Sequence, residues 1–432
     1  MSASSFDNAS RTNLTQRQRT SKAEVQPAVG QVDSEPILNT VPGRARNVRA
    51  VVSMTLKIMC VGFVLLLAGP IEPLIRFLMD DMKHGSEKGS AEIEAIGIAS
   101  RIVADAATSL EAPMREMSFS SISPAAEGED NFTTRALDAA VRRFLAAQGA
   151  TSESLHYGGL TGSLFRPTEW PICNAADSTM AALRRTIFPW LPPLCGFPAY
   201  ACISVNSQVG HGVPSAKPLR AGDLVKVDIA ARKGGFVGDT CVTFIAGGKE
   251  AAEPRASKIA EVAREALFLG ILAAGSANRT FGDIGYAVQM HSQAEGFVVN
   301  AEFSGHGVGR SFHETPVVPH TGIPGYGGPI EENQVFTIEP VLTYGNGQMS
   351  VADDGWTLVT RDGSLSAQWE HTVAITKRSV QILTLRQGEK WPQRLASKEE
   401  REKLFKRASY RAKFSSRLEE AAQLLLSDAA AP

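Results

Sequence analysis

Apolar positions along the chain recur with two spacings, and the alternation between them predicts an α+β fold. Helical spacing begins at Ala91, recurs in a second helix that ends at Gly149, and returns at residues 255–274 and 281–295. Short runs rich in β-branched residues lie between and after these helices. They predict strands at residues 200–206, 224–230, 236–245, 335–338, 357–359 and 371–375. The segment able to bury a core therefore spans residues 89–386.

Residues 1–88 lack this periodicity and form a predicted N-terminal extension. Its first 49 residues are mostly polar with scattered arginines, a composition typical of disorder. Val51–Gly69 is an apolar run close to the ~20 residues that cross a bilayer, although Lys57 interrupts it. Two interpretations stay open. The run is either a membrane span, or a helix that packs on the domain or lies in the membrane interface.

Two further segments depart from the core pattern. Residues 158–195 have little periodicity and many Trp and Pro residues, so they are predicted to be an inserted loop. Residues 387–432 are polar, basic and helical in spacing, and Ser397 with Glu400 forms a capping-box motif. A solvated surface helix is the favoured interpretation of this tail, with RNA, ribosome or membrane contact as the alternative.

Composition and charge exclude several classes of protein. Of 432 residues, 43% are hydrophobic and 21% charged, and the formal net charge is −1, so no global charge favours nucleic acid. The five cysteines form no CxxC pair. Their odd number and spacing argue against a disulfide framework and a thiolate metal site, and favour a reducing compartment.

Five residues in strand-like settings are candidate metal ligands: Asp228, Asp239, His306, Glu339 and Glu370. Four carboxylates and one imidazole are hard to borderline ligands. They suit a pair of divalent ions such as Co, Mn, Fe or Zn better than a structural thiolate zinc.

The local settings of these residues support a shared site. Asp228 and Asp239 flank Lys233-Gly234, so a tight turn there predicts that they face each other across a hairpin, ~5 Å apart at Cβ. Two carboxylates at that distance repel unless a cation lies between them. Glu339 and Glu370 follow apolar runs, where an ionised carboxylate needs a partner. Solvent-facing aspartates and glutamates paired with Arg or Lys are the alternatives for each segment alone.

Several motifs in a fixed order carry a family resemblance: CISVN, HGVP, GDLVKVDIA, GGFVGDT, GHGVGRSFHETP, FTIEP, DGWT and SAQWEHT. The chain resembles the type I methionine aminopeptidases of the pita-bread fold over about residues 90–386. The resemblance implies a pseudo-twofold antiparallel sheet covered by helices, with extensions at both ends. It also implies a metal-dependent hydrolase that removes the initiator methionine from nascent proteins whose second residue is small and uncharged.

The same resemblance implies a role for each matching residue. Asp228 would bind one metal, His306 and Glu339 the other, and Asp239 and Glu370 would bridge the two. A metal-activated water would attack the peptide carbonyl, with Glu339 as the proton shuttle. The substrate would be held by two histidines and a methionine pocket: His211, His313, Phe197, Cys202, Phe312 and Trp356.

The insert interrupts the resemblance beside this pocket, so one aromatic position is left open between Tyr157 and Leu194. The implied enzyme is a cytoplasmic monomer acting on nascent chains, with ribosome contact and attachment to a membrane through residues 51–69 as further hypotheses. Other interpretations are a proline-specific peptidase of the same fold, the type II subclass and a non-catalytic binding module. The GHGVG and HETP motifs disfavour the first, the short His313–Glu339 interval the second, and the complete ligand set the third.

Overall fold

The computed structural model describes residues 87–118, 132–158, 196–377 and 379–428. The predicted extension up to residue 86, with its apolar run, and residues 159–195 of the predicted insert lie outside these ranges. Within the described residues, no helix combines the length and apolar character needed to cross a membrane.

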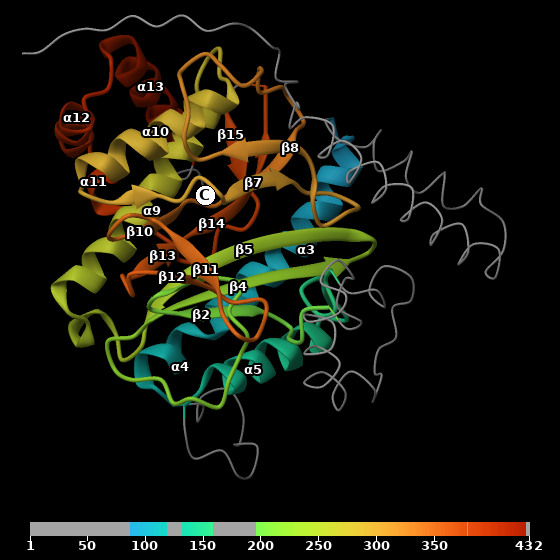
Figure 1. The fold of residues 1–432 in the computed structure, drawn as a ribbon. Helices are drawn as coiled ribbons and strands as arrows, with labels where there is room; N and C mark the ends of the chain where they lie inside the picture. The colour runs from blue at the N-terminus through green and yellow to red at the C-terminus, as the bar shows by residue number, and fades with distance from the viewer. Residues whose placement is uncertain (1–86, 119–131, 159–195, 378, 429–432) are drawn as a thin grey trace, which may run out of the picture. The chain divides into compact units, whose positions relative to one another are not determined.

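Among the described residues the main sheet has nine strands, and its paired strands run antiparallel. Its central order is β1-β4-β5-β14-β9-β7-β8, with β2 paired to β4 and β15 to β14 (Figure 1). The strands are β1 Thr151–Ser152, β2 Cys202–Val205, β4 Leu224–Lys233, β5 Phe236–Ile245, β7 Ser304–Gly307, β8 Glu314–Pro319, β9 Val335–Ile338, β14 Glu370–Ile375 and β15 Val380–Ile382.

The remaining strands form two small sheets of three strands each. One has the order β13-β10-β6, and the other has the order β11-β12-β3. Their bounds are β3 Gln208–Gly210, β6 Val298–Val299, β10 Val341–Thr343, β11 Met349–Val351, β12 Leu358–Thr360 and β13 Ser366–Gln368.

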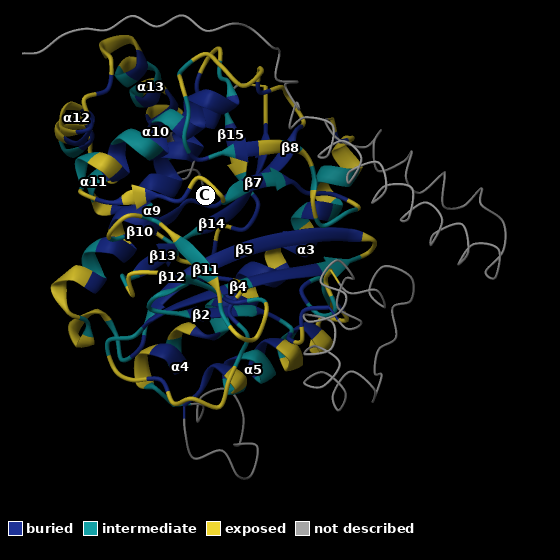
Figure 2. Ribbon diagram, in the orientation of Figure 1, coloured by how far each residue is buried: buried dark blue, intermediate teal, exposed yellow. Residues whose placement is uncertain are grey.

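Two groups of helices pack on different parts of the main sheet, as the predicted fold requires. Helix α3 packs on β4 and β5, and α9 packs on β9 and β14 and against α10. The helices are α3 Ser90–Ser109, α4 Glu111–Glu116, α5 Thr134–Ala147, α9 Pro254–Gly275 and α10 Phe281–Ala294, with a 3₁₀ turn at Lys249–Ala251. Every residue of α9 from Glu265 to Gly275 is buried, which makes α9 the central core helix (Figure 2).

The β4–β5 hairpin differs from its predicted register. Its turn is Gly234-Gly235, not Lys233-Gly234, because both glycines have positive φ values of 60° and 87°, as a two-residue hairpin turn of the I′ kind requires. Asp228 therefore pairs with Cys241, and Asp239 pairs with Ala230. The prediction that the two aspartates face each other directly was wrong. They are diagonal neighbours on the same face of the hairpin, because paired and alternate residues share a face.

The C-terminal tail is helical, as predicted, but much of it belongs to the core. It forms α11 Gln393–Ala396, α12 Lys398–Arg407 and α13 Ala412–Asp428. Leu395, Phe405, Phe414 and Leu418 are buried in the same cluster as α9 and α10. The solvated surface helix expected from the sequence therefore describes only the outer face of this tail.

A buried ion network fastens the tail to the domain. Arg394 on α11 pairs with Glu265 on α9, and also with Glu295 at 2.8 Å. His291 Nε2 lies 3.0 Å from Oε2 of Glu265, an oxygen that Arg394 also contacts. The side-chain hydrogen bonds from Arg394 and His291 lower the pKa of Glu265 to about 2 despite its burial, so the carboxylate stays ionised and paired.

We expect Leu418→Ala to lower the free energy of unfolding by about 2–5 kcal/mol, because it leaves a cavity in the core. Leu418 is fully buried on α13, whereas Leu424 on the same helix is 41% exposed. Leu424→Ala is therefore the matched control and should cost well under half as much. Urea denaturation measures both values, and equal losses would contradict the placement of α13 in the core.

Candidate active site

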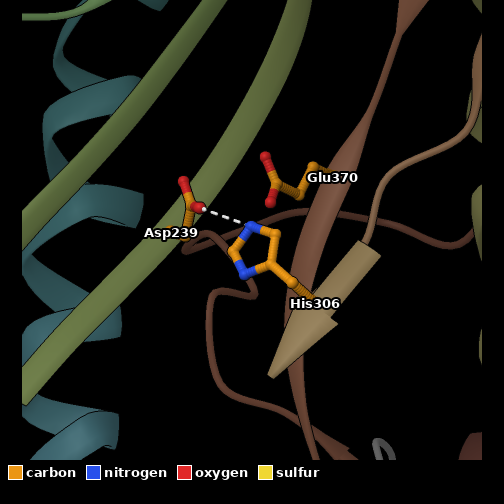
Figure 3. Close-up of side chains that lie close together, drawn as sticks. All are labelled: Asp239, His306 and Glu370. Carbon is orange, nitrogen blue, oxygen red and sulfur yellow. Dashed lines mark ion pairs between the residues drawn. The ribbon is translucent and has the colours of Figure 1, made fainter. Parts of the chain in front are cut away.

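Three potential metal ligands from three strands lie close together. Asp239 on β5, His306 on β7 and Glu370 on β14 each offer one ligand atom, and these atoms all lie within 4.8 Å of one another. Figure 3 shows the two carboxyl groups and the imidazole pointing toward one another.

The hydrogen bond of His306 determines which of its ring nitrogens faces this group. Its Nδ1 lies 3.1 Å from the carbonyl oxygen of Gly307, which can only accept, so Nδ1 carries the proton and Nε2 is left with a lone pair. Nε2 lies 3.6 Å from Asp239 Oδ2 and 3.6 Å from Glu339 Oε1. Burial lowers the pKa of His306 to about 4, so the ring is neutral at neutral pH. Three atoms with lone pairs thus converge, an arrangement that fits a cation.

The carboxylates of this site carry a strong electrostatic cost. Burial raises the pKa of Asp228 to about 7 and that of Glu339 to about 8. It raises the pKa values of Asp239 and Glu370 well above their usual range, and the neighbouring carboxylates raise them further. Asp239 Oδ1 and Glu370 Oε1 are buried and have no hydrogen-bond partner among the residues that the structure describes. Bound divalent ions would relieve both the repulsion and the missing partners, so the residues present fit such ions.

The register of four neighbouring strands explains why these side chains meet. Cys202 on β2 pairs with Asp228 on β4, Asp228 with Cys241 on β5, and Cys241 with Glu370 on β14. Directly paired residues project to the same face of a sheet, so this row places Asp228 and Glu370 on one face. Asp239 is two positions from Cys241 and shares that face.

Two polar residues that the sequence did not single out hold Glu339. Thr337 Oγ1 donates to Glu339 Oε1 at 2.9 Å and accepts from the backbone N–H of His306 at 3.0 Å. His320 Nε2 accepts from the backbone N–H of Glu339 at 3.0 Å, and its Nδ1 donates to the Phe303 carbonyl at 3.3 Å. A threonine in a strand and a histidine after an edge strand carry no signal of this role, because it arises only from pairing distant segments.

Of the two predicted substrate histidines, His313 lies beside a metal ligand, and His211 lies near enough to His313 to affect its pKa. The ring of His313 lies 4.1 Å from that of His306 between centroids. Desolvation, and then the positive charges that His306 and His211 would carry, lower the pKa of His313 to about 3. The ring of His313 is therefore neutral at neutral pH, although part of the residue is exposed. His211 follows β3 with a positive φ of 52°.

Aromatic side chains line up next to these histidines. Phe197 and Trp356 pack edge to face at 5.6 Å, and Tyr157 and Phe312 do so at 5.4 Å. The hydroxyl of Tyr157 lies 3.1 Å from Nδ1 of His313. Cys202 is half-buried opposite Asp228. Tyr157, one of the two residues considered for the open aromatic position, therefore belongs to this aromatic group. The other, Leu194, lies outside the described residues.

The residues on either side of the predicted insert meet at this aromatic group. The backbone N–H of His156 donates to the Phe197 carbonyl at 2.7 Å, and the N–H of Phe197 donates to the Tyr157 carbonyl at 2.9 Å. A side chain at Gly196 would lie 2.1 Å from the His156 carbonyl oxygen. The close approach of these two backbones brings Tyr157 and Phe197 together although 39 residues separate them in the sequence.

Comparison with known proteins agrees with this site. The model of metallopeptidase family M24 matches residues 94–377. The chain belongs to metallopeptidase family M24. Its membership confirms the predicted class of hydrolase and its use of a metal ion.

Within family M24 the chain is similar to methionine aminopeptidases. It is 44% identical to methionine aminopeptidase A of Synechocystis over an aligned stretch of 191 residues. That stretch covers 44% of this chain and 74% of the relative. It is 43% identical to the Clostridium perfringens methionine aminopeptidase over 46% of this chain and 78% of the relative. The crystal structure of the Rickettsia prowazekii enzyme aligns with a TM-score of 0.55 and 27% identity, covering 70% of this chain and 100% of that one. These likenesses confirm the pita-bread fold of the M24 family.

We expect Asp239→Asn to weaken binding of Co²⁺ at least about tenfold, because loss of even an outer partner of a metal ligand costs that much. Isothermal titration of the metal-free protein measures the affinity. Asp362→Asn is the control, since Asp362 is a fully exposed carboxylate outside the site. Equal affinities for the two variants would contradict a metal site at Asp239.

Proposed function

We propose that this chain is a dinuclear metal-dependent aminopeptidase that removes methionine from the N-terminus of polypeptides whose second residue is small and uncharged. The convergence of Asp239, His306 and Glu370 is the observation that carries the proposal. The similarity to methionine aminopeptidases supports the choice of substrate.

In this proposal the five ligands divide between two ions. Asp228 would bind one ion, His306 and Glu339 the other, and Asp239 and Glu370 would be shared. Bound divalent ions supply Lewis acidity that lowers the pKa of a coordinated water. Co, Mn, Fe and Zn all suit this ligand set, and their availability would decide among them.

Glu339 is the proposed proton carrier. Burial raises its pKa, so this carboxyl group can hold a proton under conditions in which an exposed glutamate could not. It would take the proton from the attacking water and pass it to the leaving nitrogen. Thr337 and His320 keep the side chain and backbone of Glu339 in place for this transfer.

His313 and His211 are the proposed substrate-binding groups. His313 is neutral, and its Nδ1 faces the hydroxyl of Tyr157. When that hydroxyl donates to Nδ1, the Nε2–H of His313 is free to donate to the carbonyl oxygen on which negative charge develops. His211 would hold the same peptide group from the other side.

The aromatic group would receive the methionine side chain. Phe197, Phe312, Trp356 and Tyr157 offer ring faces and edges, and Cys202 offers a polarizable sulfur. A flexible thioether makes favourable contacts with both kinds of surface. We place the reaction in the cytoplasm, where nascent chains are made. The monomeric state and the ribosome contact stay predictions from the sequence.

We expect the purified protein, loaded with Co²⁺, Mn²⁺ or Fe²⁺, to release methionine from a Met-Ala peptide and to spare a Met-Lys peptide. Chromatographic measurement of free methionine gives the rate, and Asp239→Asn should abolish it. Failure to cleave Met-Ala with any of these metals would refute the proposed function. Release of a residue that precedes proline, with Met-Ala spared, would favour a proline-specific peptidase.

A further inference from the structure

A buried ion pair joins the start of the described chain to the loop that carries His313. Lys88, which lies just before α3, donates from Nζ to the carboxylate of Glu314. Glu314 directly follows His313 in the sequence. The two side chains are only 7% and 4% exposed. Lys88 therefore contacts the loop of a proposed substrate-binding residue from a distant part of the sequence.

Both partners of this pair are fixed by further contacts. The backbone N–H of Lys88 donates to the Asn333 carbonyl at 3.0 Å, and the N–H of Asn333 donates to Ile375 at the end of β14 at 2.8 Å. Glu314 Oε1 accepts the backbone N–H of Ser311 at 2.8 Å. Backbone hydrogen bonds thus connect Lys88 to the main sheet through Asn333. The Glu314 side chain is held by the loop that precedes β8.

The loop also passes directly over the ion pair. A side-chain carbon at Gly309 would lie 2.7 Å from the carboxylate oxygens of Glu314 and 2.7 Å from Nζ of Lys88. The backbone of the loop therefore covers the pair at this point, and a residue with a side chain at position 309 would collide with it.

We propose that Lys88 is a positioning residue that holds His313 in place through Glu314. The inference rests on the proposed function, which makes His313 a substrate-binding group. A buried carboxylate without its partner is strongly unfavourable. Loss of the Lys88 charge would therefore drive Glu314 toward solvent, and His313, one residue away, would move with it.

The same loop contains a second ion pair that serves as an internal control. Arg310 pairs with Glu92 on α3 at 3.2 Å, but these side chains are 56% and 33% exposed. Exposed ion pairs of this kind contribute little to the stability of a folded protein. Both pairs connect this loop to the start of α3, and they differ mainly in how far their side chains are buried. The isosteric changes Glu314→Gln and Glu92→Gln therefore form a matched comparison.

The test measures kcat and KM of the full-length, Co²⁺-loaded protein on a Met-Ala peptide. We expect Lys88→Met and Glu314→Gln to lower kcat/KM by about tenfold or more, because small displacements of a positioning group have effects of up to ~10²-fold. Lys88→Arg should retain most of the activity, and Glu92→Gln should stay within about twofold of the wild type.

A second readout separates positioning from general destabilisation. In spectra of protein labelled with ¹⁵N-histidine, the His313 ring signals should shift in Lys88→Met, whereas those of His291, on α10, should not. The cobalt content and the folded fraction should be unchanged. If Lys88→Met does not fold, Glu314→Gln carries the test, since it keeps the side-chain shape.

Three outcomes would overturn the inference. These are kcat/KM values of both variants within twofold of the wild type, losses that Glu92→Gln reproduces, or losses that follow the folded fraction alone. Failure of the proposed function is distinguishable, because the wild type would then not cleave Met-Ala. The His313 ring signals would still report whether Lys88 positions the loop.

Discussion

Repulsion among four buried carboxyl groups is the constraint on which the rest of the structure depends. Asp228, Asp239 and Glu370 lie on three strands, and Glu339 directly follows a fourth. Burial raises the pKa of all four groups, and the charges of Asp228, Asp239 and Glu339 each raise the pKa of at least one other member further. Such a group is unfavourable on its own. The fold brings it together nonetheless, and the imidazole of His306 presents a lone pair to it and not a proton. This electrostatic cost is the physical reason to assign the site to cations.

Holding the carboxyl groups in register requires the central sheet. The row from Cys202 through Asp228 and Cys241 to Glu370 runs across four strands. A one-residue slip of β4, β5 or β14 would therefore turn a ligand to the opposite face. Threonines reinforce this register at the site. Thr240 Oγ1 donates to the Glu370 carbonyl at 2.8 Å, and Thr372 Oγ1 donates to the Asp239 carbonyl at 2.7 Å.

The sequence predicted the strands at 236–245 and 335–338 with the bounds that the structure has, because their apolar runs end at clear breaks. It also singled out Asp239, His306 and Glu370, which the structure brings together, because their motifs are local. Metal binding by the full set of five residues stays a prediction. It failed at the β4–β5 turn, where either Lys233-Gly234 or Gly234-Gly235 satisfies the local pattern and only the pairing of whole strands decides. The composition of the tail likewise did not predict that one face of α13 is buried, because charged residues on its other face make the segment polar on average.

Residues that support the ligands were beyond prediction for a related reason. Thr337, His320 and Lys88 acquire their roles from contacts with distant parts of the chain, and the local sequence around each is ordinary. Tyr157 could be named only as one of two options, and its place beside Phe197 comes from a backbone contact between distant segments. The sequence thus indicates which atoms can do chemistry, while the fold determines which atoms hold them in place.

Anomalous diffraction from crystals of the Co²⁺-loaded protein would test the central claim most directly. The account predicts two anomalous peaks on the face shared by β4, β5 and β14. One would have Asp228 as a terminal ligand and the other His306 and Glu339, with Asp239 and Glu370 in contact with both, at bond lengths of about 2 Å. Absence of anomalous density among these five residues, or strong density only elsewhere on the protein, would contradict it.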